Sequence, residues 1–234
     1  NASFPKLALG KTVVVSWTSR DGRQIEGLLT YPVGWETGRR CPLILLIHGG
    51  PASVFTQGFT AGGSTYPLQA FAQRGYAVLR PNPRGSGGYG REFRFANVND
   101  WGFGDLDDDL TGVEKVIEMG VAHPESLAVC GWSYGGFMTS FIITRTNRFK
   151  AASVGAGVTN LMSFVGTSDI PSFVPDYFLG DYWDRMETYM RHSAMFQVKN
   201  VKTPTLILHG EKDERVPLSQ GQELYVALRR FGVP

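Results

Sequence analysis

The chain has 234 residues, 42% apolar and 19% charged, proportions typical of a folded globular protein and not of a disordered one. Its formal net charge of +2 gives no field strong enough to indicate nucleic acid or an anionic membrane as a partner. The longest apolar runs are far shorter than the roughly 20 residues of a membrane-spanning helix, and no basic-then-apolar leader opens the sequence. The sequence does not determine the cellular compartment, and we slightly favour the cytoplasm.

Short apolar runs predict β-strands along the whole chain. The first two, joined by the turn-forming pair Asp21-Gly22, predict an antiparallel hairpin. The later runs are apolar without alternation, which is typical of parallel strands buried on both faces. The predicted strands cover residues 11–19, 25–31, 42–47, 76–79, 127–130, 151–154 and 205–208.

Helical patterns alternate with these runs, over residues 67–74, 105–119, 134–146 and 218–231. The second helix opens with acidic residues, which the helix dipole stabilises: Asp105, Asp107, Asp108 and Asp109. We interpret them as a solvated helix start rather than as a metal site. The alternation of strands and helices predicts one α/β domain with a mostly parallel sheet over residues 1–234.

The two cysteines, Cys41 and Cys130, exclude a disulfide-rich scaffold and a four-cysteine zinc site. Cys41 opens one predicted strand and Cys130 ends another. If the strands are parallel, several residues of about 3.3 Å each separate the two sulfur atoms, which is beyond the reach of a disulfide. We therefore expect both thiols to be reduced, with Cys130 buried as a small apolar residue.

The pattern G-x-S-x-G occurs at residues 131–135 (GWSYG), directly after a predicted strand and before a predicted helix. In this context a nucleophilic serine sits on a sharp, strained turn between strand and helix. Side chains at the flanking positions would clash, so the turn requires glycine there. The sequence therefore predicts Ser133 as a catalytic nucleophile.

The loop at residues 48–51 (HGGP) follows an earlier predicted strand. Where a serine sits on such a turn, this loop supplies one backbone N–H of the oxyanion hole, and the residue after the nucleophile supplies the other. The candidate donors are therefore the amides of Gly50 and Tyr134. Glycine lets the backbone approach a tetrahedral oxyanion closely.

A candidate triad acid lies on the loop after the last predicted strand, because the acid follows the serine in this chain order. Asp213 is the best candidate, and Glu211 and Glu214 are nearby competitors. A triad carboxylate orients the histidine and stabilises its imidazolium form. The sequence therefore predicts Asp213 as the second member of a catalytic triad.

The third member of the triad has no candidate, because no histidine follows Asp213. The histidines lie in the oxyanion loop, before a strand, between late strands and at a strand end: His48, His123, His192 and His209. None lies where the general base belongs in the order serine, acid, histidine. The expected final strand is absent too, so we expect a truncated catalytic domain.

Five segments together carry a family resemblance: residues 21–32, 48–51 (HGGP), 80–90 (RPNPRGSGGYG), 131–136 (GWSYGG) and 202–217. They are similar to the prolyl oligopeptidase family of serine peptidases, most closely its acylaminoacyl-peptidase and dipeptidyl-peptidase branches. The resemblance implies an α/β-hydrolase catalytic domain with Ser133 as nucleophile, Asp213 as triad acid, and the amides of Gly50 and Tyr134 as oxyanion hole.

The resemblance also implies partners. It implies a short peptide or acyl-peptide substrate and no metal or organic cofactor. In this family a β-propeller normally precedes the catalytic domain, and the catalytic histidine would follow Pro234 by a short stretch. An oligomer is compatible with the resemblance.

Residues 157–198 look like the variable region that helps to wall the substrate pocket. The candidate pocket residues in it are aromatic: Phe164, Phe173, Tyr177 and Phe178. Aromatic side chains of this kind line pockets for apolar groups, and they serve equally often as packing residues. Both interpretations stay open at this point.

Three functions remain for the chain as a whole. The first is a serine peptidase domain that hydrolyses oligopeptides through an acyl-enzyme. The second is a carboxylesterase on the same site, which would cleave esters and not peptides. The third is a catalytically inactive binding module that has kept the hydrolase fold.

Overall fold

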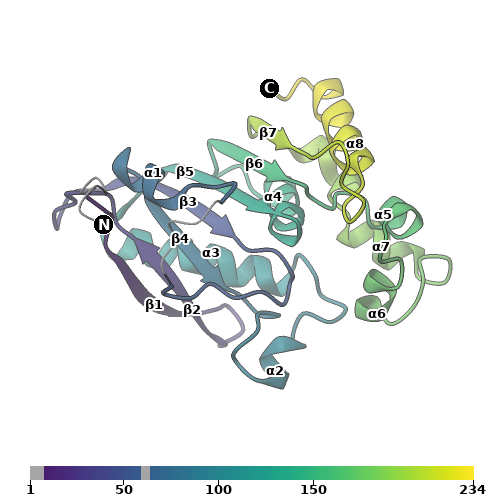
Figure 1. Cartoon of the computed structure of the whole chain (residues 1–234), viewed down its shortest axis with the longest axis horizontal. Helices are drawn as coiled ribbons and strands as arrows, with labels where there is room; N and C mark the ends of the chain where they lie inside the picture. The colour runs from purple at the N-terminus through teal and green to yellow at the C-terminus, as the bar shows by residue number, and fades with distance from the viewer. Residues whose placement is uncertain (1–7, 59–63) are drawn as a thin grey trace, which may run out of the picture.

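A computed structural model describes residues 8–58 and 64–234 (Figure 1). The described residues form a seven-stranded sheet in the order β1-β2-β4-β3-β5-β6-β7. Its strands are β1 (Thr12–Thr18), β2 (Gln24–Thr30), β3 (Cys41–Ile47), β4 (Ala77–Asn82), β5 (Ala122–Trp132), β6 (Ala151–Gly155) and β7 (Thr205–Leu208). No helix in the described ranges is long and apolar enough to cross a membrane.

The pairing of the strands confirms the predicted hairpin and the predicted parallel sheet. β1 pairs antiparallel with β2, and β2 pairs antiparallel with β4. All later pairs are parallel. β5 begins five residues earlier than expected, since its first half is polar and exposed and carries no apolar signal. The sheet is therefore mostly parallel, as the expected α/β-hydrolase fold requires.

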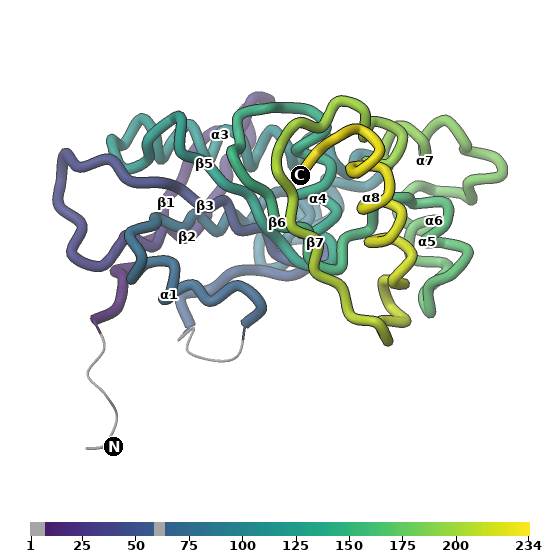
Figure 2. Tube along the Cα trace, turned by 90° about the horizontal axis from the view of Figure 1, so that it is seen from above, coloured from purple at the N-terminus to yellow at the C-terminus, as the bar shows by residue number. Residues whose placement is uncertain are grey.

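The four predicted helices are present as α1 (Leu68–Gln73), α3 (Gly104–Glu118), α4 (Tyr134–Arg145) and α8 (Leu218–Arg230). Short helices that the apolar pattern did not reveal lie between β6 and β7. They are α5 (Leu161–Thr167), α6 (Phe173–Phe178), α7 (Met186–His192) and a 3-10 helix η1 (Ala194–Asn200); the four-residue α2 (Arg91–Arg94) follows β4. Both views place α5, α6 and α7 beside α8, far from the β1–β2 edge (Figures 1 and 2).

Side chains on each strand alternate between the two faces of the sheet. On β3, Leu43, Leu45 and Ile47 join the larger apolar core, whereas Ile44 and Leu46 join a smaller one. The larger core also holds buried residues of α3, α4 and α8, and the smaller core holds Leu68 of α1. Each face of the parallel strands is therefore apolar, which explains the unbroken apolar runs.

Helix α4 lies inside the larger core. Every residue from Tyr134 to Thr144 is buried, and the helix contacts β3, β5, β6 and η1. A helix that is apolar on all sides is typical of a fully buried position. The N-terminus of α4, where the predicted nucleophile lies, is thus held on a rigid support.

The prediction of a solvated start for α3 is wrong. Asp105, Asp108 and Asp109 are all 0% exposed, and only Asp107 of the four lies partly in solvent. Residues at spacings of three and four lie on one face of a helix, and this face of α3 turns inward. The physical reason is tertiary, because Arg84 and Tyr134 provide buried partners for two of these carboxylates.

Both cysteines are free, as expected, and both are buried, as was expected of Cys130. Cys41 is paired in the sheet with Ala122 and Cys130 with Leu46, so the two lie toward opposite ends of β3 and β5. Burial raises the pKa of the Cys130 thiol to about 12, which keeps it protonated. Cys130 therefore acts as a small apolar side chain in the smaller core.

Candidate active site

Ser133 occupies the turn between the last residue of β5 and the first residue of α4. Its backbone has φ 60° and ψ −117°, in the left-handed region that a residue with a Cβ rarely adopts. Such a conformation costs about 1–3 kcal/mol and persists only where its surroundings enforce it. The Ser133 N–H donates to the carbonyl of Gly155 at 2.9 Å, and its carbonyl accepts from the Phe137 N–H at 2.9 Å.

The flanking glycines allow this turn to pack against its neighbours. A Cβ added at Gly131 would lie 2.5 Å from the Gly135 carbonyl group. A Cβ added at Gly135 would lie 2.2 Å from the carbonyl oxygen of Ile47, the last residue of β3. The steric reason expected for these glycines therefore holds in the structure.

The loop after β3 runs beside the serine. A Cβ added at Gly49 would meet the Ser133 Cβ at 3.4 Å, and Gly50 has φ 125°, which favours glycine. His48 is buried under this loop, where its Nε2 lies 3.0 Å from the Ser86 hydroxyl. Burial lowers the pKa of His48, which keeps the ring neutral. The loop thus brings the backbone, and not the His48 side chain, to the serine.

A pocket of about 380 Å³ opens at the serine. Ser133, Gly50 and Tyr134 all line it, so the predicted nucleophile and both predicted oxyanion donors share one cavity. Most of its wall is apolar: Trp101, Phe137, Val158, Phe164, Ile170, Phe173 and Val216. Arg215 carries the only charge among the described lining residues. The wall would suit an apolar side chain next to a polar main chain.

The structure divides the four predicted pocket aromatics into two pairs. Phe164 and Phe173 line the pocket. Tyr177 and Phe178 instead pack behind the wall, with ring centroids 4.7 Å and 5.5 Å from that of Trp101. Trp101 itself escaped the sequence analysis, since it precedes α3 by a short loop and no local motif marks it.

Asp213 lies half-buried in the loop between β7 and α8. Its Oδ1 accepts a hydrogen bond of 2.9 Å from the Val216 N–H. Val216 and Arg215 line the serine pocket, so this loop forms part of the site. The competitors Glu211 and Glu214 are exposed.

None of the four histidines forms a hydrogen bond with Ser133 or Asp213 in the part of the chain that the structure describes. His192 is buried, with Nδ1 2.6 Å from the Trp101 carbonyl oxygen. His209 Nε2 lies 2.7 Å from the carbonyl oxygen of Val216, and His123 is exposed at the start of β5, opposite the serine. Among the described residues, the side chains of His192 and His209 therefore bond to backbone carbonyls and not to the serine or Asp213.

Comparison with known proteins identifies the family. The model of the prolyl oligopeptidase family matches residues 64–234. The chain belongs to the prolyl oligopeptidase family. It is 41% identical over 222 residues to an uncharacterized peptidase, YuxL, of Bacillus subtilis, covering 93% of this chain and 33% of that protein.

Solved structures of acylaminoacyl peptidases share the fold. The acylaminoacyl peptidase of Pyrococcus horikoshii superimposes with a TM-score of 0.88 at 31% identity, over 97% of this chain and 36% of that one. An acylaminoacyl peptidase in complex with Z-Gly-Gly-Phe-chloromethyl ketone matches with the same TM-score of 0.88, identity of 31% and coverage of 97% and 36%. The chain spans about a third of the length of these relatives.

Proposed function

We propose that this domain is the catalytic domain of a serine peptidase that acts on short peptides or acyl-peptides. The observation that carries the proposal is the position of Ser133. It occupies a strained turn at the N-terminus of a buried helix and faces an apolar pocket of about 380 Å³. Strain that the surrounding structure enforces is typical of a functional site.

In the proposed reaction, Ser133 Oγ forms a bond to the carbonyl carbon of the substrate as a general base takes its proton. The C–N bond then breaks, and the same proton goes to the leaving amine. Water then attacks the resulting ester as the base takes a proton from it. The base returns this proton to Ser133 Oγ as the ester C–O bond breaks. The chain releases a peptide acid and regenerates the serine.

The oxyanion of each tetrahedral intermediate would accept hydrogen bonds from the backbone N–H groups of Gly50 and Tyr134. Their common location in the serine pocket supports this role. Donors fixed before the reaction lower the barrier because they need no reorganisation as charge develops. Asp213 would orient the histidine, and its loop supports that role because the loop carries two pocket residues.

The general base of the proposed site is a histidine from outside the printed sequence. The support is by elimination, since all four histidines of the chain are described and each is engaged elsewhere or remote. We propose that the full-length protein supplies it, together with a β-propeller that restricts access to short peptides. A full-length protein that degrades folded substrates would contradict the second part.

The substrate class follows from the wall of the pocket. Phe164, Phe173 and Val158 would contact an apolar side chain beside the scissile bond. Arg215 at the same pocket would donate hydrogen bonds to a main-chain carbonyl of the substrate. We therefore expect peptides with a large apolar residue on the acyl side to be preferred.

The test is labelling of the full-length protein by a fluorophosphonate, read by intact mass, with Ser133→Ala as the variant. Ser140→Ala is the matched control, since Ser140 is a buried serine of the same helix whose hydroxyl donates to the Phe137 carbonyl. We expect one adduct on the wild type and on Ser140→Ala, and none on Ser133→Ala. A folded wild type that stays unlabelled would overturn the proposal and favour an inactive module.

Parallel assays with an acyl ester and the corresponding peptide amide distinguish the two hydrolase activities. Esters react fast with any activated serine, whereas amides require efficient protonation of the leaving group. Cleavage of both supports the peptidase. Cleavage of the ester alone would favour a carboxylesterase on the same site.

A further inference from the structure

A buried hydrogen bond joins helix α3 to the residue that follows the serine. The Tyr134 hydroxyl donates to Asp105 Oδ2 at 2.5 Å. The other carboxylate oxygen, Oδ1, accepts from the N–H groups of Gly102 at 2.8 Å and Leu106 at 3.0 Å. Asp105 is 0% exposed, so its position is fixed by these three donors.

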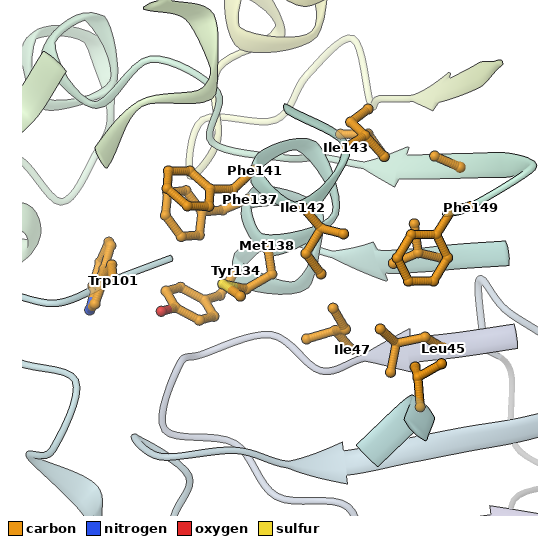
Figure 3. Close-up of a cluster of buried hydrophobic side chains, with 14 of the residues drawn as sticks. Leu45, Ile47, Trp101, Tyr134, Phe137, Met138, Phe141, Ile142, Ile143 and Phe149 are labelled. Carbon is orange, nitrogen blue, oxygen red and sulfur yellow. The ribbon is translucent and has the colours of Figure 1, made fainter. Parts of the chain in front are cut away.

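Tyr134 is the first residue of α4 and connects two parts of the site. Its ring lies 5.0 Å from that of Trp101 and 5.2 Å from that of Phe137, all three in the wall of the pocket. Figure 3 shows these rings gathered at the start of α4, with the Tyr134 hydroxyl turned toward the side of Trp101. The backbone N–H of the same residue is the proposed oxyanion donor. The hydroxyl and the backbone amide therefore belong to one residue, whose side chain is fixed at its hydroxyl end by Asp105.

We propose that Asp105 is a positioning residue for the oxyanion hole, acting through the Tyr134 hydroxyl. The carboxylate holds the Tyr134 side chain, the side chain holds the first turn of α4, and that turn aims the amide at the oxyanion. The inference rests on the proposed function, because it assigns a role at the same serine. Asp105 touches no substrate and is not a catalytic residue.

The surroundings of Asp105 make this contact sensitive to pH. The groups that face it are acidic or phenolic: Asp100, Asp108, Asp109 and Tyr134, with Arg84 paired to Asp108. Burial raises the pKa of Asp105 to about 7, and the bond from Tyr134 opposes that rise. Near neutral pH the carboxylate thus changes between a charged form, which accepts strongly from Tyr134, and a neutral form, which accepts weakly.

The test compares the rate of fluorophosphonate labelling of the full-length protein between pH 5.5 and 9, because the phosphonyl oxygen occupies the oxyanion hole during the reaction. Tyr134→Phe removes only the hydroxyl. Tyr189→Phe is the matched control, since Tyr189 is also buried and its hydroxyl donates to the Gly180 carbonyl away from the site. We expect labelling about tenfold slower for Tyr134→Phe, less than the 10²–10³-fold loss of a whole donor, and within twofold of wild type for the control.

The pH profile separates positioning from simple stabilisation. Without the Tyr134 hydroxyl the protonation of Asp105 no longer reaches the amide, so the acid limb of the profile should lose the part that follows Asp105. In the Asp105→Asn background the same Tyr134→Phe change should leave the acid limb unchanged, since no carboxylate remains.

A folded Tyr134→Phe protein that labels as fast as the control, with an unmoved acid limb, would overturn the inference and leave the proposed function intact. Failure of the wild type to label would overturn the proposed function itself.

Discussion

Two acidic segments of the chain have similar composition and opposite environments. On α3, Asp105, Asp108 and Asp109 are 0% exposed. In the loop after β7, Glu211 and Glu214 are exposed and Asp213 is half-buried. A helix places residues three and four positions apart on one face, so the first segment turns its carboxylates inward together. A loop at a strand end has no such repeat, and its charges stay near solvent.

The difference shows that a run of acidic residues does not by itself indicate exposure. The loop segment has its best candidate for chemistry in Asp213, which we propose as the triad acid. The helical segment has a structural task, because its carboxylates join α3 to Arg84 and to Tyr134. Changes in the loop should therefore alter activity, and changes in the helix should alter stability first.

The largest expected effect is on activity, at Asp213. Asp213→Ala in the full-length protein should lower kcat by roughly 10⁴-fold, because the histidine loses its orienting partner. The melting temperature should stay close to that of the wild type, since the side chain accepts only one described hydrogen bond, from the Val216 N–H. A decrease in kcat below tenfold, measured with a peptide amide, would transfer the role to Glu211 or Glu214.

The second effect is on stability, at Asp108. Asp108 accepts hydrogen bonds from Arg84 Nε at 2.9 Å and Nη2 at 2.7 Å, and Arg84 is itself buried. Asp108→Ala leaves that guanidinium without its buried partner, which should cost about 3 kcal/mol of unfolding free energy. Urea unfolding measures the loss. A loss below 1 kcal/mol would mean that Asp21, which also pairs with Arg84, suffices.

A third effect concerns the pH dependence of stability. Burial raises the pKa of Asp105 to about 7, so the folded state binds a proton more tightly than the unfolded state. Asp105 therefore makes its full contribution to the unfolding free energy, on the order of 4 kcal/mol, below about pH 4. This contribution is lost as the pH rises from about 4 toward 7. Asp105→Asn should flatten the fall in melting temperature between pH 4.5 and 7.5. Parallel curves for the two proteins would contradict this assignment.

The smallest effect is expected at Asp107, the partly exposed member of the helical segment. Its ion pair with Arg20 spans 3.3 Å, and both side chains are at least 36% exposed. Exposed pairs contribute little because water and salt screen them, so Asp107→Asn should change the unfolding free energy by less than about 0.5 kcal/mol. A loss comparable to that of Asp108→Ala would remove the distinction between the two faces of α3.

Much of the fold and the centre of the site could be predicted from the sequence. The apolar runs located all seven strands of the described sheet. The hairpin at Asp21-Gly22 was correctly predicted to be antiparallel. The turn at Ser133 was predicted because its determinants are local. Steric conflict at Gly131 and Gly135 depends on residues within a few positions and on the adjacent strand. Such short-range constraints leave a pattern in the sequence itself.

Tertiary structure alone decided which side chains face the serine. Trp101 and Arg215 come from loops that are remote in sequence from α4, and nothing local marks them as pocket residues. Tyr177 and Phe178 had the same aromatic character as Phe164 and Phe173 but pack against Trp101 and do not line the pocket. The partnership of Asp105 with Tyr134 spans 29 residues. Burial and pairing of this kind depend on how whole elements pack, and a one-dimensional pattern does not contain that information.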